Sequence, residues 1–266
     1  MPNTLSIVED PQPDDGNNEY LYQQFTLKGI SLDIRAMADD ERFTLDKMME
    51  RDCNIPISQC TFTVYKNAMP FCWDLNGEGV AFRASTRAST GQFTIWVPEG
   101  GHEVYIDHLR RLALSKAFAR EFNALIADPK YWFDFSPTTL FESESLDITS
   151  SEHSWSFLEP AVSSNGSAKY GHSYTDVNSG IVDGPTSLAA EAFTHFTFER
   201  SKGRFMVSNL VADVENYLNL KSSTIHTLDN ERLGSLDSNK HERGFESFFS
   251  SHHCNNVQQC LAEHET

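Results

Sequence analysis

The stretch "FTHFTFERSKGRFMVSNLVADVENYL" (residues 193–218) is the most informative part of this chain for predicting its fold. Its alternation of apolar and polar side chains predicts two β-strands joined by a tight turn, followed by a loop that carries Asn209, Asp213 and Glu215. An aspartate at the end of a strand can hold a metal ion, whereas an asparagine offers only a neutral carbonyl oxygen. Whether the loop supports metal-dependent chemistry therefore depends on which residue occupies the metal-binding position.

The size and charge of the chain limit its fold and its partners. Of the 266 residues, 39% are hydrophobic, which is enough to bury a core in one large domain or in two small lobes. The formal net charge is −17, and the sequence has no run of basic residues. Nucleic acids and anionic membranes bind clusters of Lys and Arg, so this composition argues against both as partners. A basic protein or peptide is a compatible partner.

The cysteines and the N-terminus indicate a compartment. The chain has five cysteines, an odd number that does not suit a disulfide framework. It has neither an apolar signal-peptide core at its start nor a stretch of 18 apolar residues. We therefore expect a reducing environment and a cytoplasmic location.

The order of the sequence patterns predicts an α+β protein with two lobes. Residues 1–20 are rich in Asp, Glu and Pro without Lys or Arg, which is typical of a disordered acidic tail. Residues 21–150 form the N-terminal lobe: strands with period two lead into one long helix over residues 101–128. Residues 151–266 form a mixed C-terminal lobe, with a buried strand at residues 154–162. The segment "GPTSLAAEAFTHFTFER" (residues 184–200) is expected to open with a turn and a helix and to run into the strand that contains His195. The C-terminal third of the chain is loop-rich, with one or two helical turns in "RGFESFFSSHHC".

A cluster of potential metal ligands lies near the C-terminus. The segment "FFSSHHCNNVQQCL" contains His252, His253, Cys254 and Cys260, and His195 on the preceding predicted strand is a candidate fourth ligand. Zinc prefers a tetrahedron of imidazole nitrogens and thiolates. The spacing alone leaves two interpretations open: a structural zinc site that holds a segment poor in apolar residues, or two free cysteines near a frayed terminus.

Five stretches, in order, resemble the α-kinase family of atypical protein kinases. The segment "EAFTHFTFERSKGRFMVSNLVA" follows the family's A-F-S-H-[FW]-T-Y-E-x-S-x-G-x-L-x-V-x-D-L-Q-G pattern without a gap. The other four stretches are "ALSKAFAREFNALI", "SFLEPAVSSNGSAKY", "LGSLDSN" and "RGFESFFSSHHCNNVQQC". The resemblance covers residues 60 to 261 approximately. It implies the two-lobed α-kinase fold, with ATP and Mg²⁺ as cofactors of the active members.

The resemblance also implies a structural zinc ion in the C-terminal lobe. The positions that match the family's zinc ligands are His195, His252, Cys254 and Cys260. The spacing of the two cysteines is Cys-x5-Cys here, against Cys-x3-Cys in the family. Two additional residues can loop out, so Cys260 is retained as a ligand, with His253 as a substitute.

The same comparison suggests that the catalytic residues are lost. In the ungapped alignment, the family's metal-binding Asp falls on Asn209 and its Gln falls on Val211. A second family Asp, ten residues further on, falls near Asn219 or Leu220. Neutral side chains thus replace groups that phosphoryl transfer requires for holding metal and orienting the attacking hydroxyl.

A shifted alignment would preserve an acidic site. The segment "LVADVEN" (residues 210–216) resembles the family's L-V-V-D-L-Q-G and places Asp213 at the metal and Glu215 at the Gln position. It requires four inserted residues in a hairpin that otherwise fits without a gap, and they would bulge the strand "RFMVS". We therefore favour the ungapped alignment and Asn209.

The remaining nucleotide-binding positions are only partly kept. The family's phosphate-binding lysine has no counterpart, because no lysine lies between Lys66 and Lys116. Gly234 of the glycine loop remains, but Asp237 replaces a second glycine and would repel phosphate. Glu159 and Lys169 match the strand and loop beside the adenine.

These observations predict an α-kinase-fold pseudokinase. It would keep the fold and the zinc ion, bind a protein partner, and bind a nucleotide at most without turnover. One alternative is an active Ser/Thr kinase that uses Asp213 and Glu215. A second is an unrelated zinc-stabilised binding module, for which the ordered matches would be coincidence.

Overall fold

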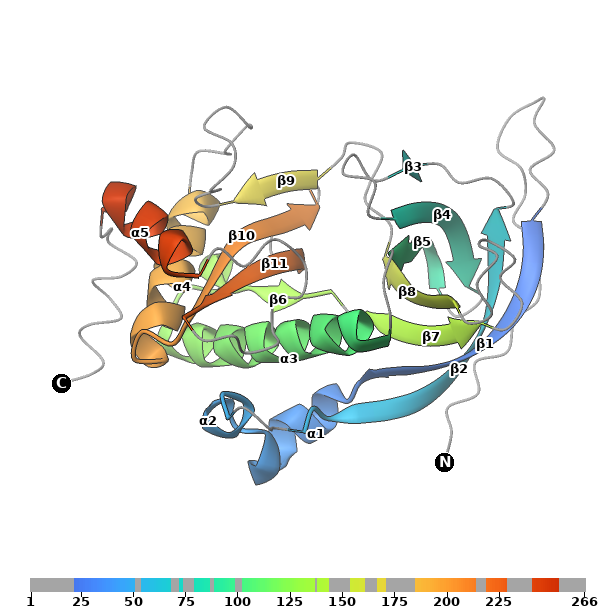
Figure 1. The fold of residues 1–266 in the computed structure, drawn as a ribbon, viewed down its shortest axis with the longest axis horizontal. Coiled ribbons are helices and arrows are strands. Elements are labelled where there is room, and N and C mark those ends of the chain that lie inside the picture. Colours follow the sequence, from blue (N-terminus) through green and yellow to red (C-terminus); the bar gives the residue numbers. More distant parts are fainter. Residues whose placement is uncertain are drawn as a thin grey trace. The chain divides into compact units, whose positions relative to one another are not determined.

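The computed structural model divides the chain into two compact units (Figure 1). One unit comprises residues 1–34, 56–105 and 137–162, and the other comprises residues 35–55, 106–136 and 163–266. None of the helices described is long and apolar enough to cross a membrane. The structure describes residues 22–50, 54–67, 72–73, 79–86, 89–98, 102–136, 138–143, 154–160, 167–170, 185–213, 219–228 and 241–253. The predicted acidic tail, residues 1–20, lies outside these ranges.

The first unit is built on a seven-stranded antiparallel sheet. Its strand order is β2-β1-β7-β8-β5-β4-β3, and β2 also pairs with β4, so the sheet closes on itself. Such closure removes exposed edges that would otherwise recruit further strands. The strands are β1 (Tyr22–Leu32), β2 (Ile57–Asn67), β3 (Cys72–Trp73), β4 (Gly79–Thr86), β5 (Ser89–Pro98), β7 (Thr139–Ser143) and β8 (Ser154–Pro160). The prediction of antiparallel strands in this region is confirmed.

Strand β8 joins this sheet and not the second one. The strand pairs with β5 on one side and with β7 on the other. Phe157 and Leu158 of β8 are buried with Leu140 and Phe141 of β7. The predicted strand at residues 154–162 is therefore present, but a lobe boundary at residue 150 would assign it to the C-terminal lobe.

The second unit surrounds a four-stranded sheet with helices. The strand order is β6-β11-β10-β9, with β6 parallel to β11 and the other pairs antiparallel. The strands are β6 (Asp134–Phe135), β9 (Ser167–Tyr170), β10 (Phe205–Asp213) and β11 (Asn219–Thr227). The helices are α1 (Ile34–Asp39), α2 (Leu45–Met48), α3 (His102–Leu125), α4 (Pro185–Arg200), α5 (Glu242–Ser251) and the 3-10 helices η1 (Glu41–Phe43) and η2 (Pro129–Tyr131).

Helix α3 confirms the long helix expected over residues 101–128. It ends at Leu125, and the Asp128 side chain then caps η2 by accepting a hydrogen bond from the backbone of Lys130. Figure 1 shows α3, in green, alongside β6 and β11. From residue 106 onwards this helix belongs to the second unit, although the sequence assigned it to the N-terminal lobe.

The first of the two strands predicted within residues 193–218 is wrong, because its residues belong to helix α4. Residues 193–200 are helical, and only β10 is a strand in that stretch. The alternation of Phe and Thr looks like period two, but these residues are buried on nearly all sides of a helix, which removes the amphipathic signal. The fully or almost fully buried residues of α4 are Ser187, Ala189, Ala190, Ala192, Phe193, Thr194, Phe196 and Thr197.

Aromatic packing joins α3 and α4. The ring of Phe122 lies 5.4 Å from Phe193 and 5.6 Å from Phe196, measured between centroids. Phe133, which follows η2, completes the group at 6.0 Å from Phe122. Burying large aromatic side chains supplies most of the apolar area that stabilises such an interface.

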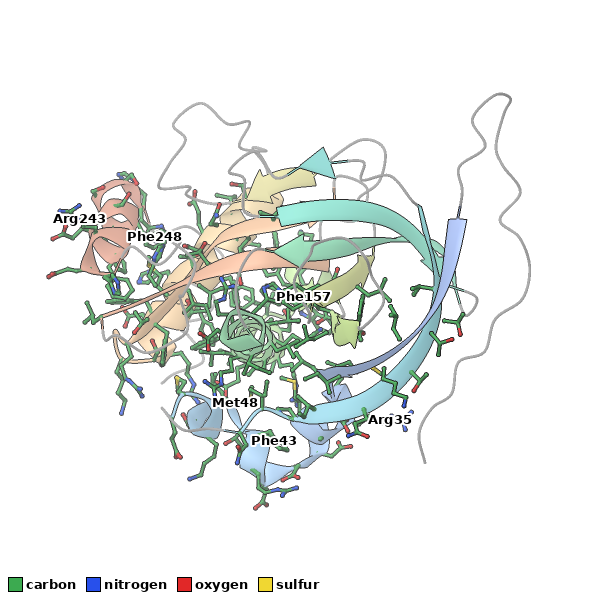
Figure 2. All side chains as sticks on the ribbon, turned by 45° about the vertical axis from the view of Figure 1, so that its right-hand side comes forward. Arg35, Phe43, Met48, Phe157, Arg243 and Phe248 are labelled. Atoms are coloured by element: carbon green, nitrogen blue, oxygen red, sulfur yellow. The ribbon has the colours of Figure 1, made fainter. Side chains whose placement is uncertain are left out.

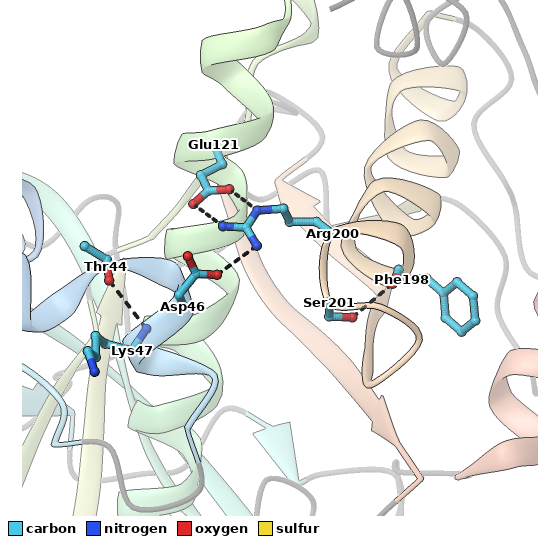
Figure 3. Close-up of polar contacts among 7 residues, drawn as sticks. All are labelled: Thr44, Asp46, Lys47, Glu121, Phe198, Arg200 and Ser201. Atoms are coloured by element: carbon cyan, nitrogen blue, oxygen red, sulfur yellow. Dashed lines mark hydrogen bonds and ion pairs between the residues drawn. The ribbon is translucent and has the colours of Figure 1, made fainter. Parts of the chain in front are cut away.

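Hydrogen bonds from arginine side chains connect the segment between β1 and β2 with α3 and with the end of α4. Arg200, at the end of α4, donates hydrogen bonds to Glu121 of α3 at 2.6 and 3.2 Å and to Asp46 of α2 at 2.9 Å (Figure 3). Arg204 donates to the carbonyl oxygen of Met49, and Arg120 donates to that of Met37. Residues 35–50 are therefore an integral part of the second unit.

Candidate functional site

Strand β10 contains a bulge at Asn209. Ser208 lies opposite Thr224 of β11 and Val211 lies opposite Ser222, so β10 has one residue more than its partner between these pairs. Asn209 adopts a φ of 50° in the left-handed region, which asparagine tolerates better than most residues. Bulges redirect side chains and are frequent next to active sites. The backbone thus gives position 209 a special orientation within the sheet.

The side chain of Asn209 makes one weak polar contact. Its Nδ2 donates to Oγ1 of Thr224 at 3.4 Å, which is near the limit for a hydrogen bond. Its Oδ1 is buried and has no hydrogen-bond partner in the described part of the chain. A buried acceptor without a donor is rare in proteins and suits a donor group or a cation supplied from outside. A neutral amide oxygen is nevertheless a weaker ligand for Mg²⁺ than a carboxylate.

The other sequence candidates on this sheet lie along β9 and β10. The backbone of Val211 pairs with that of Lys169 in β9 and with that of Ser222 in β11. Asp213, at the end of β10, pairs with Ser167. The sheet therefore brings positions 211 and 169 together, while Asn209 lies two residues away along the same strand.

Three other residues predicted for the site are not among the described residues of this four-stranded sheet. Glu159 belongs to β8 in the first unit, where its backbone pairs with Thr94. Glu215 and Gly234 lie outside the described residues. Thr224, the partner of Asn209, was missed in the sequence, because the polar segment "NLKSSTIHT" of β11 lies in a region interpreted as loop-rich.

The two histidines of the predicted zinc site lie together. His195 is on helix α4 and not on a strand as predicted, and His252 follows the last residue of α5. Their ring centroids are 5.0 Å apart. Two imidazoles that ligate one tetrahedral zinc ion at ~2.0 Å hold their nitrogens roughly 3.3 Å apart, which this ring spacing allows. Nε2 of His195 also lies 3.4 Å from the carboxylate of Glu199, a kind of neighbour that commonly orients metal ligands.

The sulfur ligands of that site lie outside the described residues. Cys254 and Cys260 both follow the last described residue, His253. Within the described ranges, no group of three or more His, Cys, Asp or Glu side chains is arranged to hold a metal ion. His253, the substitute ligand, is exposed and its Nδ1 lies 2.9 Å from the carbonyl oxygen of Ser251. Two nitrogen donors are in place, and the fit of the complete set depends on the two thiols.

Comparisons of the whole chain with solved structures identify the fold. An α-kinase of Entamoeba histolytica superimposes with a TM-score of 0.72 over 92% of this chain and 93% of its own, at 22% identity. The α-kinase domain of myosin heavy chain kinase A in complex with AMP gives a TM-score of 0.65 over 91% and 99% of the two chains, at 14% identity. Identities this low establish a shared fold and no more.

Sequence comparisons find related kinases. Elongation factor 2 kinase of Caenorhabditis elegans is 37% identical over 84 residues, and myosin heavy chain kinase B of Dictyostelium discoideum is 27% identical over 157 residues. These matches span 32% and 59% of this chain but only 10% and 19% of those proteins. The α-kinase family model matches residues 81–258, which is more than half of the chain. The chain therefore belongs to the α-kinase family.

Proposed function

We propose that this protein is an α-kinase-fold pseudokinase, which binds a protein partner and does not transfer phosphate. The observation that carries the proposal is Asn209, whose neutral amide occupies the bulge of β10. In the ungapped alignment this is the family's metal-binding aspartate, and Val211 takes the place of its glutamine. Both replacements remove polar groups that active members present to the nucleotide.

The electrostatics of phosphoryl transfer explain why the replacement matters. The reaction depends on positioning and on charge neutralisation, since metal ions bridge the phosphates and offset the developing charge. Mg²⁺ is held mainly by carboxylates, and an uncharged oxygen at position 209 contributes little to its binding. The Asn209 amide is also engaged with Thr224 through its nitrogen.

The size of the bulge, one residue, is smaller than the insertion of four residues that the shifted alignment requires. The irregularity adds one residue to β10 at Asn209–Leu210, and one additional residue on β11 compensates for it before Ala212 pairs with Leu220. The shifted alignment, with Asp213 and Glu215 in the active site, requires four inserted residues. Active Ser/Thr kinase chemistry through Asp213 and Glu215 is thus the alternative that the experiment must exclude.

The proposed partners follow from charge and from the relatives. A chain with a net charge of −17 attracts a basic protein surface and disfavours nucleic acid. A nucleotide is a second ligand of the proposal, because the α-kinase domain of myosin heavy chain kinase A has been solved with AMP. Glu159, Lys169 and Gly234 are its proposed contacts. Zinc at His195, His252, Cys254 and Cys260 has a structural role, and the location is cytoplasmic.

The proposal is tested by nucleotide-dependent thermal stability and by a kinase assay. Melting temperatures are measured without nucleotide, with ATP, and with ATP and Mg²⁺, for the wild type and for Asp213→Ala. Asp39→Ala, which removes an exposed carboxylate of α1, serves as the control. A ligand that binds only the native state raises the melting temperature.

We expect no Mg²⁺-dependent shift in any of the three proteins and no transfer of labelled γ-phosphate to a basic protein substrate. A Mg²⁺-dependent shift that Asp213→Ala abolishes and Asp39→Ala retains, together with phosphate transfer, would establish the active alternative. A shift with ATP alone is compatible with a nucleotide-binding pseudokinase.

A further inference from the structure

Helix α3 carries a stripe of polar residues that is buried. Asp107, Arg111 and Ser115 are spaced by four residues and so share one face of the helix. Their exposed fractions are 5%, 8% and 0%. Oγ of Ser115 lies 3.0 Å from Oγ of Ser223 on β11, which fixes this face against the four-stranded sheet. Arg111 lies one turn, about 6 Å, closer to the N-terminus of the helix.

This stripe lies on a different face of the sheet from the Asn209 contact. Ser223 and Thr224 are consecutive residues of β11, and successive side chains of a strand point to opposite faces. Ser223 contacts α3, whereas Thr224 accepts the hydrogen bond from Asn209. The surroundings of Arg111 are therefore separate from the position at which the family binds metal.

The guanidinium group of Arg111 has one buried nitrogen, Nε, without a hydrogen-bond partner among the described residues. An arginine has five N–H donors, and here Nη2 makes one long contact of 3.4 Å to Nδ1 of His108. Burial lowers the pKa of Arg111, and the nearby charge of Asp107 opposes that effect only in part.

Arg111 forms no ion pair with the residues that the structure describes. Asp107 is the carboxylate whose charge acts on Arg111, and its Oδ1 also lies 3.7 Å from Nη1 of Arg110. No carboxylate oxygen in the described ranges lies within 4.0 Å of Arg111. One carboxylate thus faces two guanidinium groups on the same turn of α3. A buried cation without a partner is strongly unfavourable, and native proteins rarely retain one.

We infer that Arg111 is the centre of a second ligand site, which binds a phosphate group on the α3 face of the sheet. The planar guanidinium offers a fork of parallel N–H donors that matches phosphate oxygens. A phosphate also has enough acceptor oxygens to use several of the donors that the protein leaves open. The source is either free phosphate or the phosphate of a small molecule. The site lies beyond the proposed function, because it requires neither catalysis nor the Asn209 position.

The test compares anions at constant ionic strength. Melting temperatures are measured in sodium chloride, sodium acetate and sodium phosphate, and with ATP without Mg²⁺, at pH 7.5 and about 0.15 M ionic strength, where screening limits long-range repulsion by the acidic chain. Phosphate is expected to raise the melting temperature along a saturating curve, and acetate is not. Stabilisation by phosphate and ATP alike assigns the site to the phosphate group. Stabilisation by ATP alone supports a nucleotide phosphate at Arg111 only if Arg111→Met abolishes it. If Arg111→Met retains it, ATP binds at the separately proposed contacts Glu159, Lys169 and Gly234, and the proposal is overturned. Equal stabilisation by acetate, or no stabilisation by any anion, overturns the proposal.

Two variants connect the effect to Arg111. Arg111→Met keeps an unbranched apolar stem and removes the guanidinium group, and Arg110→Met does the same for the half-exposed neighbour that shares Asp107. Arg111→Met should weaken phosphate binding by about tenfold or more, whereas Arg110→Met should retain it.

The stability of the variants without phosphate is an independent readout. If Arg111 has no partner in the native chain, Arg111→Met will melt in chloride at the wild-type temperature or above it, because a buried unpaired charge is replaced by an apolar side chain. A large loss of stability, or failure to fold, would mean that Arg111 has a stabilising partner within the chain, and the phosphate site would be rejected.

Discussion

The imidazole rings of His195 and His252 meet edge to face, with their centroids 5.0 Å apart and their planes at 79°. Phenylalanines of α5 hold both rings: Phe248 stacks on His252 at 4.5 Å, and Phe249 contacts His195 at 5.6 Å. Figure 2 shows Phe248 and the exposed Arg243 on opposite sides of α5. Aromatic packing therefore brings two nitrogen donors together where the family resemblance expects zinc.

The first prediction is that the protein contains one zinc ion that stabilises the end of α5. Metal analysis of the purified chain should give about one zinc per molecule. Removing it with a chelator should lower the melting temperature by at least about 6 °C, since bound metal contributes directly to the free energy of folding. His252→Asn and Cys254→Ser should each reproduce this loss.

His253→Asn is the matched control for the zinc prediction, because His253 is exposed and directed to the backbone of Ser251. This variant should keep its zinc and its melting temperature. Zinc-free protein that melts like the metal-bound form would show that the aromatic contacts alone hold the helix.

The second prediction concerns Gly244 in the first turn of α5. A Cβ atom at this position would lie 2.5 Å from Cγ of His226, an imidazole that is 4% exposed on β11. Gly244→Ala should therefore lower the free energy of unfolding by ~1–2 kcal/mol, because overpacking outweighs the better helix propensity of alanine. Chemical denaturation measures this change.

A double-mutant cycle separates this clash from other effects on α5. In a His226→Ala background the added methyl group has space, so Gly244→Ala should cost roughly 1–2 kcal/mol less than in the wild type. Ser250→Ala, on the exposed side of the same helix, should change stability by less than about 0.5 kcal/mol. Equal costs of Gly244→Ala in both backgrounds would show that His226 is not the obstacle.

The third prediction is that Arg200 stabilises the second unit through its two carboxylate partners. The hydrogen bonds to Glu121 raise the pKa of Arg200 most, and the hydrogen bond to Asp46 raises it further. Arg200→Gln should lower the free energy of unfolding by about 1–2 kcal/mol. This is less than for a fully buried ion pair, because the side chain of Arg200 is 28% exposed. Lys202→Gln, two residues later and exposed, is the control. An unchanged denaturation midpoint for Arg200→Gln would contradict the prediction.

The fourth prediction is a small loss of stability in acid that depends on Asp46. The hydrogen bond from Arg200 holds the pKa of Asp46 below its ordinary value. Stability from such a carboxylate is fully present above the unfolded pKa of about 3.9 and disappears as the pH falls through the folded pKa.

Asp46→Asn should therefore be less stable than the wild type at pH 6 by a few tenths of a kcal/mol, since the carboxylate is 71% exposed. The difference should shrink as the pH falls below the unfolded pKa of about 3.9, and it should disappear below the lower folded pKa. Melting curves from pH 2.5 to 7 measure it, and a constant difference over that range would exclude titration of Asp46 as its cause.

The sequence predicted those elements whose apolar residues recur with a clear period. The alternation around residues 60–97 and the long apolar stripe of α3 correspond to real strands and a real helix. The start of helix α4 was expected to be helical, but residues 193–200 were mistaken for a strand because buried residues surround the helix, so neither period dominates. Strand β11 was missed because Thr224, His226 and Thr227 are buried polar residues, and polarity alone suggests a loop.

The candidate site was only partly accessible to sequence reasoning. The pairing of His195 with His252 followed from a motif, but its helical setting did not. The bulge and the left-handed φ at Asn209 depend on the register with β11, which no local pattern encodes. Arg111 gave no signal, because a charged residue within a long helix is usually solvated, and only tertiary packing shows that it is buried.

The last prediction is that a carboxylate at position 209 restores metal dependence. Asn209→Asp should lower the free energy of unfolding by about 1–2 kcal/mol without metal. The hydrogen bond that Nδ2 donates to Thr224 is lost, and a charge is placed where Oδ1 is buried. With ATP present, Mg²⁺ should then raise its melting temperature, whereas the wild type shows no such response. Asn209→Ala removes the same hydrogen bond without adding a charge, so it should be destabilised and remain indifferent to Mg²⁺. If Asn209→Asp also ignores Mg²⁺, the metal position in this chain is not at residue 209, and Asp213 becomes the residue to substitute next.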